Sequence, residues 1–312
     1  MEESKRQIKP SSIVFLIIYI VIILILSYFT IINFYKIKNE TKNKESIKNE
    51  LVKVKSEYDS LMTTQQSLVS EITNLKNIDD NIESIKNEVF ILAKQVEEKI
   101  QNKETNYKIA YLTFDDGPYY LTDSVIKTLK ENKVKATFFT IGQGKETCFD
   151  NRSASCLDTY KKIVDNGHTI ANHTYSHAIF YGLYNSTDSF MKEVEKQEEL
   201  IYSKTGVKTN ILRFPGGSAT AGTLKNGIIS KLREKGYGWV DWSAQDGDGG
   251  NLTSVSQAWS NFKNSINDNI EVVLFHDYNQ ITYSILPDVI KYLEERDYIL
   301  LPLFYESVMI NK

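Results

Sequence analysis

The chain has 312 residues, of which 41% are hydrophobic and 25% are charged. This composition excludes a chain that is disordered throughout and suits one sizeable globular domain or two small ones. The formal net charge is −3, and basic side chains are not in excess over residues 107–312. We therefore expect no nucleic-acid partner bound by phosphate neutralisation.

The first segment predicts a membrane anchor. Residues 13–32 contain no charged residue, glycine or proline, and at about 1.5 Å per residue a helix of this length matches a bilayer core of roughly 30 Å. No small-residue cleavage site follows, so we predict an uncleaved single span at 13–35 after a cytoplasmic N-terminus at 1–12. The flanking lysines mildly favour the opposite orientation, but long domains cross membranes largely regardless of charge.

Residues 36–106 predict a helical stalk. They contain neither glycine nor proline, and between residues 47 and 75 the apolar positions alternate in steps of four and three. This heptad seam is typical of a coiled coil, through which copies of the chain would self-associate. The phase slips near residues 79 and 80, where a stammer or a helix break is expected before a second run from Val89 to Ile100. A solvated charged spacer and two helices folded back on each other remain as alternatives.

Residues 107–312 predict an α/β domain, since all 15 glycines lie at Gly117 or later and strand-like runs alternate with helical ones. Strands are expected at 108–114, 136–141, 169–172, 210–214, 238–241, 271–275 and 298–303. Helices are expected at 121–132, 157–165, 188–205, 225–235, 254–266 and 283–296. Strict alternation implies parallel strands, so we predict an irregular (β/α)7-type, TIM-like barrel with its chemistry at the C-terminal strand ends.

Two carboxylates end the first predicted strand. Asp115 and Asp116 precede Gly117 and Pro118, and adjacent carboxylates at a strand end repel each other unless a cation compensates. A divalent metal held by one Asp, with the other working as a base, would resolve this conflict. An Asp-rich surface turn is the alternative.

Three of the four histidines lie just past predicted strands. His173 and His177 are four residues apart, the spacing that places two imidazoles on one face of a helical turn. Together with Asp116 they would give two nitrogens and one oxygen, a set that leaves a catalytic zinc an open position. His276 follows a later strand, whereas His168 precedes its strand and is expected to be a core or capping residue.

The remaining strand ends carry further polar side chains. Arg213 ends the fourth predicted strand, where its guanidinium would clamp a carboxylate. Asp241 and Trp242 follow the fifth strand, and His276 follows the sixth. Chance seldom produces such a constellation at successive strand ends.

These motifs resemble the polysaccharide deacetylases of carbohydrate esterase family 4, also called the NodB homology domain. The resemblance covers about 107–312. TFDDGP stands complete at 113–118, and His-Thr-x-x-His stands at 173–177 with Ala178 in place of a frequent proline. Arg-x-Pro stands at 213–215, with Gly216 where many members carry an aromatic residue. The fourth motif is Asp241-Trp242, with Asp246 as an alternative, and Leu-x-His stands at 274–276.

The resemblance implies a function for most of these residues. Asp116, His173 and His177 would hold one divalent metal, usually zinc, with cobalt, nickel or manganese as alternatives, and this metal would activate water and polarise the acetamide carbonyl. The other polar residues implied to act in catalysis are Asp115 as the base, Arg213 as its holder, His276 as the acid and Asp241 as the residue that orients it. A backbone N–H in the turn after Tyr119 or Tyr120 would face the oxyanion. Substrate-binding positions are expected at Tyr119, Pro215, Trp242 and Leu274, the latter two equally compatible with core packing.

Two loops have open interpretations. Cys148 and Cys156 flank residues 149–155, and outside the membrane they could form a disulfide, with buried thiols as the alternative. Residues 246–251 resemble a calcium loop but lack the later acidic ligands of an EF-hand. We interpret them as a flexible loop at the site.

We therefore predict a metal-dependent hydrolase anchored in the membrane of a bacterial envelope, with its catalytic domain outside. The expected reaction is de-N-acetylation of N-acetylglucosamine in peptidoglycan, which should hinder lysozyme-type hydrolases. Other substrates remain open, namely N-acetylmuramic acid, poly-N-acetylglucosamine, chitin oligomers and O-acetyl esters. A non-catalytic envelope scaffold is the alternative from a different class, and the complete set of metal and acid-base residues weighs against it.

Overall fold

The computed structural model describes residues 94–142 and 154–304, with only the backbone at 154–157, and the single positions 56, 59, 60, 62 and 91. The chain divides into two compact units, Met1–Ile85 and Lys86–Lys312. The described positions of the first unit are helical. The anchor expected at 13–35, nearly all of the expected stalk, and the possible disulfide between Cys148 and Cys156 lie outside the described residues. Within the described part, no helix is long and apolar enough to cross a bilayer.

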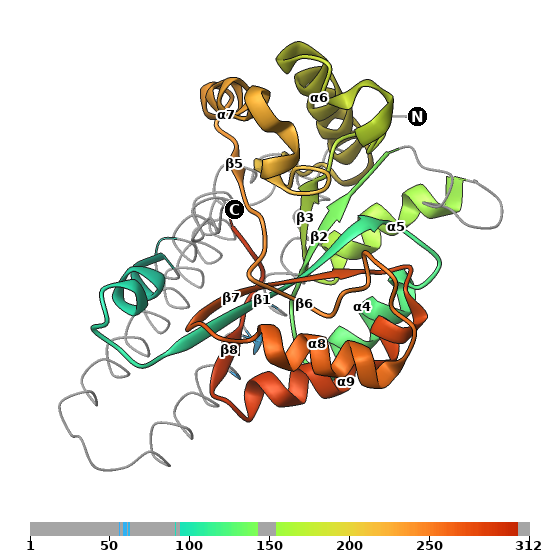
Figure 1. Ribbon diagram of the computed structural model, residues 1–312. Helices are drawn as coiled ribbons and strands as arrows, with labels where there is room; N and C mark the ends of the chain where they lie inside the picture. Colours follow the sequence, from blue (N-terminus) through green and yellow to red (C-terminus); the bar gives the residue numbers. More distant parts are fainter. Residues whose placement is uncertain are drawn as a thin grey trace, which may run out of the picture. The chain divides into compact units, whose positions relative to one another are not determined.

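The second unit is a parallel sheet wrapped by helices (Figure 1). Its strands are β1 (Lys108–Gly117), β2 (Thr137–Thr140), β3 (Thr169–Asn172), β4 (Ile211–Leu212), β5 (Gly238–Trp239), β6 (Ala244–Gln245), β7 (Ile270–His276) and β8 (Tyr298–Leu300). Its helices are α4 (Thr122–Glu131), α5 (Ala154–Asp165), α6 (Thr187–Thr205), α7 (Lys225–Glu234), α8 (Val255–Ser265) and α9 (Gln280–Glu294). Short helical turns lie at Ile179–Leu183 and Ser218–Leu224.

The strand order is β5-β4-β3-β2-β1-β7-β6, and β8 also pairs with β1. Every described pairing is parallel, which confirms the predicted α/β class. Among the described residues β5 and β6 do not pair with each other, so the barrel is open between them. Strand β6 was not predicted, because two residues are too short to show an alternating pattern.

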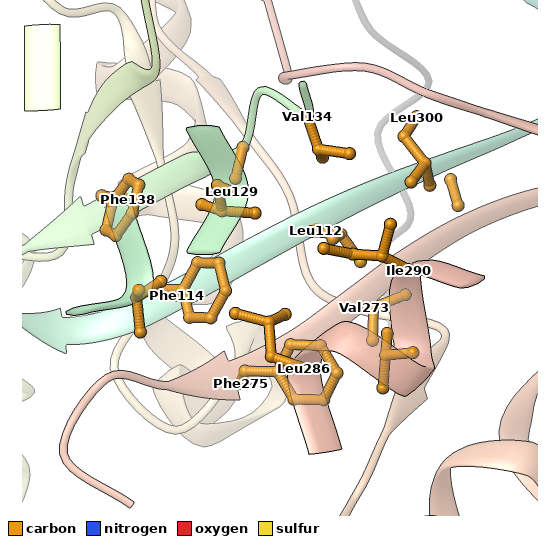
Figure 2. Close-up of a cluster of buried hydrophobic side chains, with 14 of the residues drawn as sticks. Leu112, Phe114, Leu129, Val134, Phe138, Val273, Phe275, Leu286, Ile290 and Leu300 are labelled. Carbon is orange, nitrogen blue, oxygen red and sulfur yellow. The ribbon is translucent and has the colours of Figure 1, made fainter. Parts of the chain in front are cut away.

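Side chains alternate between the two faces of β1. Ala110, Leu112 and Phe114 contact an outer core that lies between the sheet and helices α4, α8 and α9, and Figure 2 shows part of this core. Ile109 and Tyr111 contact an inner core on the other face of the sheet. Burial of these continuous apolar runs on both faces is typical of parallel strands and fixes the register of β1.

The same alternation continues to the strand ends. Phe139 of β2, Ala171 of β3 and Val272 of β7 belong to the inner core, and Ile211 of β4 does so as well. Residues two or four positions further along each strand direction point to the same face. Asp115, His173, Arg213 and His276 have this parity, so they form the layer directly beyond the inner core.

The helical segment 94–101 contacts the inner core from before β1. Val96 and Ile100 pack in that core, and Ile100 is buried. Buried Glu97 accepts a hydrogen bond from the Tyr111 hydroxyl. We expected Val96 and Ile100 on the seam of a stalk, but the structure places both in the fold of the second unit.

Candidate active site

Asp116 leaves the regular alternation of β1. The pairing between β1 and β2 shifts between Asp115 and Gly117, and Asp116 has a φ of 69°, a left-handed conformation that costs free energy in a residue other than glycine. As a result both carboxylates lie at the same end of the strand. Thr174 and His177 also have positive φ, 63° and 51°, so local strain is concentrated around this site.

Among the described residues, one cluster could hold a metal ion. It consists of Asp116, His173 and His177, each of which offers one ligand atom within 4.8 Å of the other two. Asp116 Oδ1 lies 3.4 Å from His173 Nε2 and 3.3 Å from His177 Nε2. This oxygen is buried and has no hydrogen-bond partner among the described residues, although buried carboxylate oxygens normally have one. The orphaned oxygen and the donor set therefore fit a divalent cation such as zinc.

His173 is held ready to donate a nitrogen lone pair. Burial, followed by the neighbouring His177, lowers the pKa of His173 to about 3, so its imidazole is neutral. Its Nδ1–H donates to the Arg213 carbonyl at 2.8 Å, which leaves Nε2 unprotonated and facing Asp116. A backbone carbonyl bound to the far nitrogen is the usual support of a metal-ligating histidine.

Asp115 is buried against Arg213. Arg213 Nη1 donates to Asp115 Oδ1 at 2.8 Å and to Thr113 Oγ1 at 2.7 Å. The guanidinium is fully buried and also donates to the carbonyls of Val240 and Asp241. Burial raises the pKa of Asp115, and the Arg213 charge opposes that rise. Asp115 Oδ2 remains 3.6 Å from His173 Nε2, next to the candidate metal site.

His276 pairs with Asp115 across β1 and β7 and is held by Asp248. Its Nδ1–H donates to Asp248 Oδ1 at 2.7 Å, and its backbone N–H donates to Asp248 Oδ2 at 2.7 Å. Burial by itself would lower the pKa of His276, but the carboxylates of Asp248, Asp116 and Asp115 together outweigh burial, and the pKa rises to about 10. His276 Nε2 lies 3.8 Å from Asp116 Oδ2.

The geometry thus joins a candidate metal triad, a buried carboxylate and an imidazolium at one end of the sheet. The sequence profile of the polysaccharide deacetylases matches residues 102–233. A peptidoglycan N-acetylglucosamine deacetylase from Bacillus cereus is 31% identical over 196 residues, which are 61% of this chain and 67% of that protein. The chain belongs to the polysaccharide deacetylase family.

Other comparisons of this polysaccharide deacetylase agree. YheN of Bacillus subtilis is 30% identical over 198 residues, which are 61% of this chain and 65% of YheN. The chain therefore spans about two thirds of the length of these two relatives. The catalytic domain of a peptidoglycan N-acetylglucosamine deacetylase from Eubacterium rectale superposes with a TM-score of 0.59 at 28% identity, covering 66% of this chain and 92% of that one.

The structure corrects the residue expected to orient His276. Asp241 lies at the end of β5, where its carboxylate accepts hydrogen bonds from the Ser218 N–H at 2.8 Å and the Ser218 hydroxyl at 2.6 Å. Asp248 makes the bond to His276 Nδ1 instead. Asp246, the alternative, accepts from the Thr282 hydroxyl at 2.7 Å and lies behind Asp248. Sequence reasoning missed Asp248, which is the second acidic residue of the loop 246–251 that we interpreted as a flexible loop at the site.

The residues expected to bind substrate lie at several places around the site. Tyr119 lies in an aromatic cluster with Tyr120 and Tyr278, and the Tyr278 ring is 5.0 Å from His276. The Tyr119 N–H donates to Thr122 Oγ1 at 2.7 Å, so this N–H is already used in the turn that was expected to face an oxyanion.

The other three expected positions are more enclosed. Leu274 is buried in β7 with the inward parity of His276. The Trp242 ring lies 6.0 Å from the Arg213 guanidinium. The buried Pro215 accepts at its carbonyl from the Tyr184 hydroxyl at 2.8 Å. His168 is buried and its Nδ1 accepts from the Ala136 N–H, which confirms its expected place in the core.

Proposed function

We propose that this deacetylase removes the acetyl group from N-acetylglucosamine of peptidoglycan, releasing acetate and leaving a free amine on the glycan. One arrangement carries the proposal: Asp115 and His276 face the Asp116, His173 and His177 triad from adjacent strands. A relative from Bacillus cereus with that printed activity aligns with this chain over 67% of its own length. The anchor expected at 13–35 would hold the domain beside such a substrate.

Asp116, His173 and His177 would hold the divalent metal, with zinc as the proposed ion. When bound, such an ion supplies a Lewis acid for the acyl carbonyl oxygen and lowers the pKa of water. The neutral state of His173 leaves its Nε2 able to bind a cation without first losing a proton.

Asp115 would take the proton from the attacking water. Its raised pKa makes it a better proton acceptor than an ordinary carboxylate, and Arg213 holds it in one orientation. As the water oxygen bonds to the acyl carbon, this carbon becomes tetrahedral and the former carbonyl oxygen becomes negatively charged. The proton then resides on Asp115, and Arg213 stabilises the remaining negative charge of the site.

His276 would complete the reaction by protonating the leaving nitrogen. As the proton from His276 Nε2 passes to the departing nitrogen, the carbon–nitrogen bond breaks and acetic acid forms. The acid loses its proton to give acetate, the free amine takes up a proton, and the proton held by Asp115 returns to His276. Asp248, with the charges of Asp116 and Asp115, keeps the proton on this imidazole at neutral pH, since together they raise its pKa to about 10 against the effect of burial. The free amine would be protonated, and we propose that the altered wall resists lysozyme-type hydrolases.

Mass spectrometry of wall fragments tests this proposal. Full-length protein, solubilised in a mild detergent, is incubated with isolated peptidoglycan with and without a chelator. We expect a chelator-sensitive loss of acetyl groups that fragmentation assigns to glucosamine. Loss from muramic acid instead, or from ester-linked acetyl groups, would replace the substrate, and no loss from a zinc-loaded protein would reject the reaction.

The Asp115→Asn variant tests the role of the base. We expect its turnover to fall by about 10²–10⁴, because a positioned proton acceptor contributes that much. Its zinc content should stay close to that of wild type, since the three proposed ligands are intact. Asp188→Asn is the matched control, because Asp188 is an exposed acid that pairs with Lys231 on the surface. Full activity of Asp115→Asn would exclude Asp115 as the base.

A further inference from the structure

Phe180 and Tyr181 are two consecutive aromatic residues that each remain 90% exposed. They lie in the short turn Ile179–Leu183 that follows β3. Large aromatic side chains usually bury most of their area on folding, and an exposed apolar pair on a protein surface often marks a binding site. Neither side chain has a role in the fold or in the proposed reaction.

This turn is fixed to the protein rather than loosely attached. The Tyr184 hydroxyl donates to the Pro215 carbonyl at 2.8 Å, and Leu183 is buried in a core cluster. Ile179 Cδ1 lies 3.3 Å from where a Cβ on Gly216 would stand. Both flanks of the aromatic pair are therefore held against the loop that follows Arg213.

The turn also lies at the rim of the active site. Phe180 comes three residues after His177, so their Cα atoms are at most about 11 Å apart. Gly216 has a φ of 73° and no side chain, and Ile179 occupies space beside it. A side chain from the β3–α6 connection thus fills the position that a larger residue at 216 would otherwise use.

We propose that Phe180 and Tyr181 form a sugar-stacking subsite that binds a pyranose ring next to the sugar whose acetamide reaches the metal triad. This inference rests on the proposed function and deepens it. The flat face of a pyranose presents C–H groups, and the negative face of an aromatic ring attracts them while apolar area is buried. The ligand class is a neutral glycan chain rather than a single sugar.

The surroundings of the pair favour a glycan over other occupants. Residues 174–191 contain no lysine or arginine, whereas helices and loops that rest on anionic membranes usually combine aromatic and basic residues. Two side chains also present far less area than a stable dimer interface requires. The neutral amide of Asn185 lies beside Gly182 of the same turn, since its Nδ2 is 3.2 Å from where a Cβ on Gly182 would stand, and an amide suits the hydroxyl groups of a sugar.

The dependence of KM on the length of the glycan substrate tests the subsite. The double variant Phe180→Ala with Tyr181→Ala is compared with wild type on N-acetylglucosamine hexasaccharide and on the monosaccharide, using full-length protein. We expect KM for the hexasaccharide to rise at least about tenfold more than KM for the monosaccharide, which corresponds to about 1.4 kcal/mol. Replacement of both residues by tryptophan should restore the wild-type ratio. Tyr202→Ala is the control, since Tyr202 is an exposed aromatic near the far end of α6.

Binding without turnover keeps this test separate from that of the proposed function. Cosedimentation with insoluble peptidoglycan measures glycan binding even if no acetyl group is released, and the double variant should bind several-fold less than Tyr202→Ala. Equal binding and an unchanged ratio of KM values would overturn the subsite. A selective loss of binding to lipid vesicles, or of self-association, would overturn it in favour of those occupants.

Discussion

Three buried carboxylates near the site differ in the side chains that they contact. They belong to Asp115, Asp248 and Asp277. Asp115 has the Arg213 guanidinium, and Asp248 has the His276 imidazole. In the part of the chain that the structure describes, Asp277 Oδ2 accepts from the Thr122 hydroxyl, and Asp277 Oδ1 is buried without a hydrogen bond. Burial disfavours the ionised form unless a cation compensates. The Arg213 charge opposes the rise in the pKa of Asp115, whereas burial raises the pKa of Asp277 to about 7.

Replacing Asp248 should change the pH profile of the reaction. In Asp248→Asn the carboxylate that raises the pKa of His276 against burial is gone, so the imidazolium deprotonates far below its present value of about 10. We expect the alkaline limb of kcat/KM to move down to near or below neutral pH, with a loss of at least about 10² at pH 8. Initial rates between pH 5 and 10 measure this shift.

The Asp241→Asn variant tests whether Asp248 or Asp241 orients His276. The Asp241 carboxylate bonds to Ser218 rather than to His276, so this variant should keep the alkaline limb where wild type has it, whatever its effect on stability. If Asp241→Asn moved the limb and Asp248→Asn did not, the structural assignment would be wrong.

Asp277 should make stability depend on pH. Burial raises its pKa to about 7, with the Thr122 hydroxyl opposing the rise. Its contribution to stability is full below the unfolded value of 3.8 and is lost as pH rises toward about 7, because the folded state must then bury a charge. Asp277→Asn should therefore unfold with a higher free energy at pH 8, on the order of a few kcal/mol. Denaturant titrations at pH 5 and pH 8 give the difference, and an equal effect at both values would contradict the explanation.

At the scale of elements, helix α9 supports the acid of the site. Thr282 in its first turn donates to Asp246 and Asp248, and the Asn279 side chain caps the helix by accepting from the Ile281 N–H at 2.9 Å. The cap therefore positions Thr282, and Thr282 contacts the carboxylate that holds His276.

Removing this cap should affect both stability and activity. Asn279→Ala is expected to cost about 1 kcal/mol of unfolding free energy and to lower kcat/KM several-fold, since the first turn of α9 loosens. Ser254→Ala removes the matched cap of α8, where Ser254 accepts from the Gln257 N–H at 3.2 Å. It should cost a similar free energy with a smaller change in kcat/KM. Equal kinetic losses in the two variants would show that α9 has no special link to the site.

The elements themselves were largely predictable. Helix α7 was expected at 225–235 and lies at Lys225–Glu234, and β3 was expected at 169–172 and lies at Thr169–Asn172. Their periodic apolar patterns are local properties of the sequence. Short elements such as β6 escaped, because the tertiary pairing with β7 and not a local pattern defines them.

At the scale of the whole molecule, the second compact unit begins before β1. Ile100 and Glu97 are buried against the barrel, so the segment that we expected to end a stalk belongs in part to the catalytic unit. A chain that begins at residue 106 leaves the Tyr111 hydroxyl without Glu97 and exposes the inner core where Ile100 lay.

Truncation tests this boundary. A chain starting at Lys86 should unfold with a free energy about 2–4 kcal/mol higher than one starting at residue 106, from burial of Ile100 and the buried hydrogen bond between the Tyr111 hydroxyl and Glu97. Thermal and denaturant unfolding of the two chains measure the difference. In the longer chain, Ile100→Ala should reproduce part of the loss in stability, and equal stabilities of the two chain lengths would mean that the segment contributes nothing.

The sequence by itself determined the α/β class, most strand and helix positions, and the strand ends that carry Asp115, Asp116, His173, His177, Arg213 and His276. These follow from local periodicity and from motifs whose members lie close together in the chain. Only the tertiary structure decided that Asp248 rather than Asp241 holds His276, that Ile100 packs in the inner core, and that Phe180 and Tyr181 remain exposed. Those facts depend on which distant segments meet across the barrel, and local patterns carry no record of such contacts.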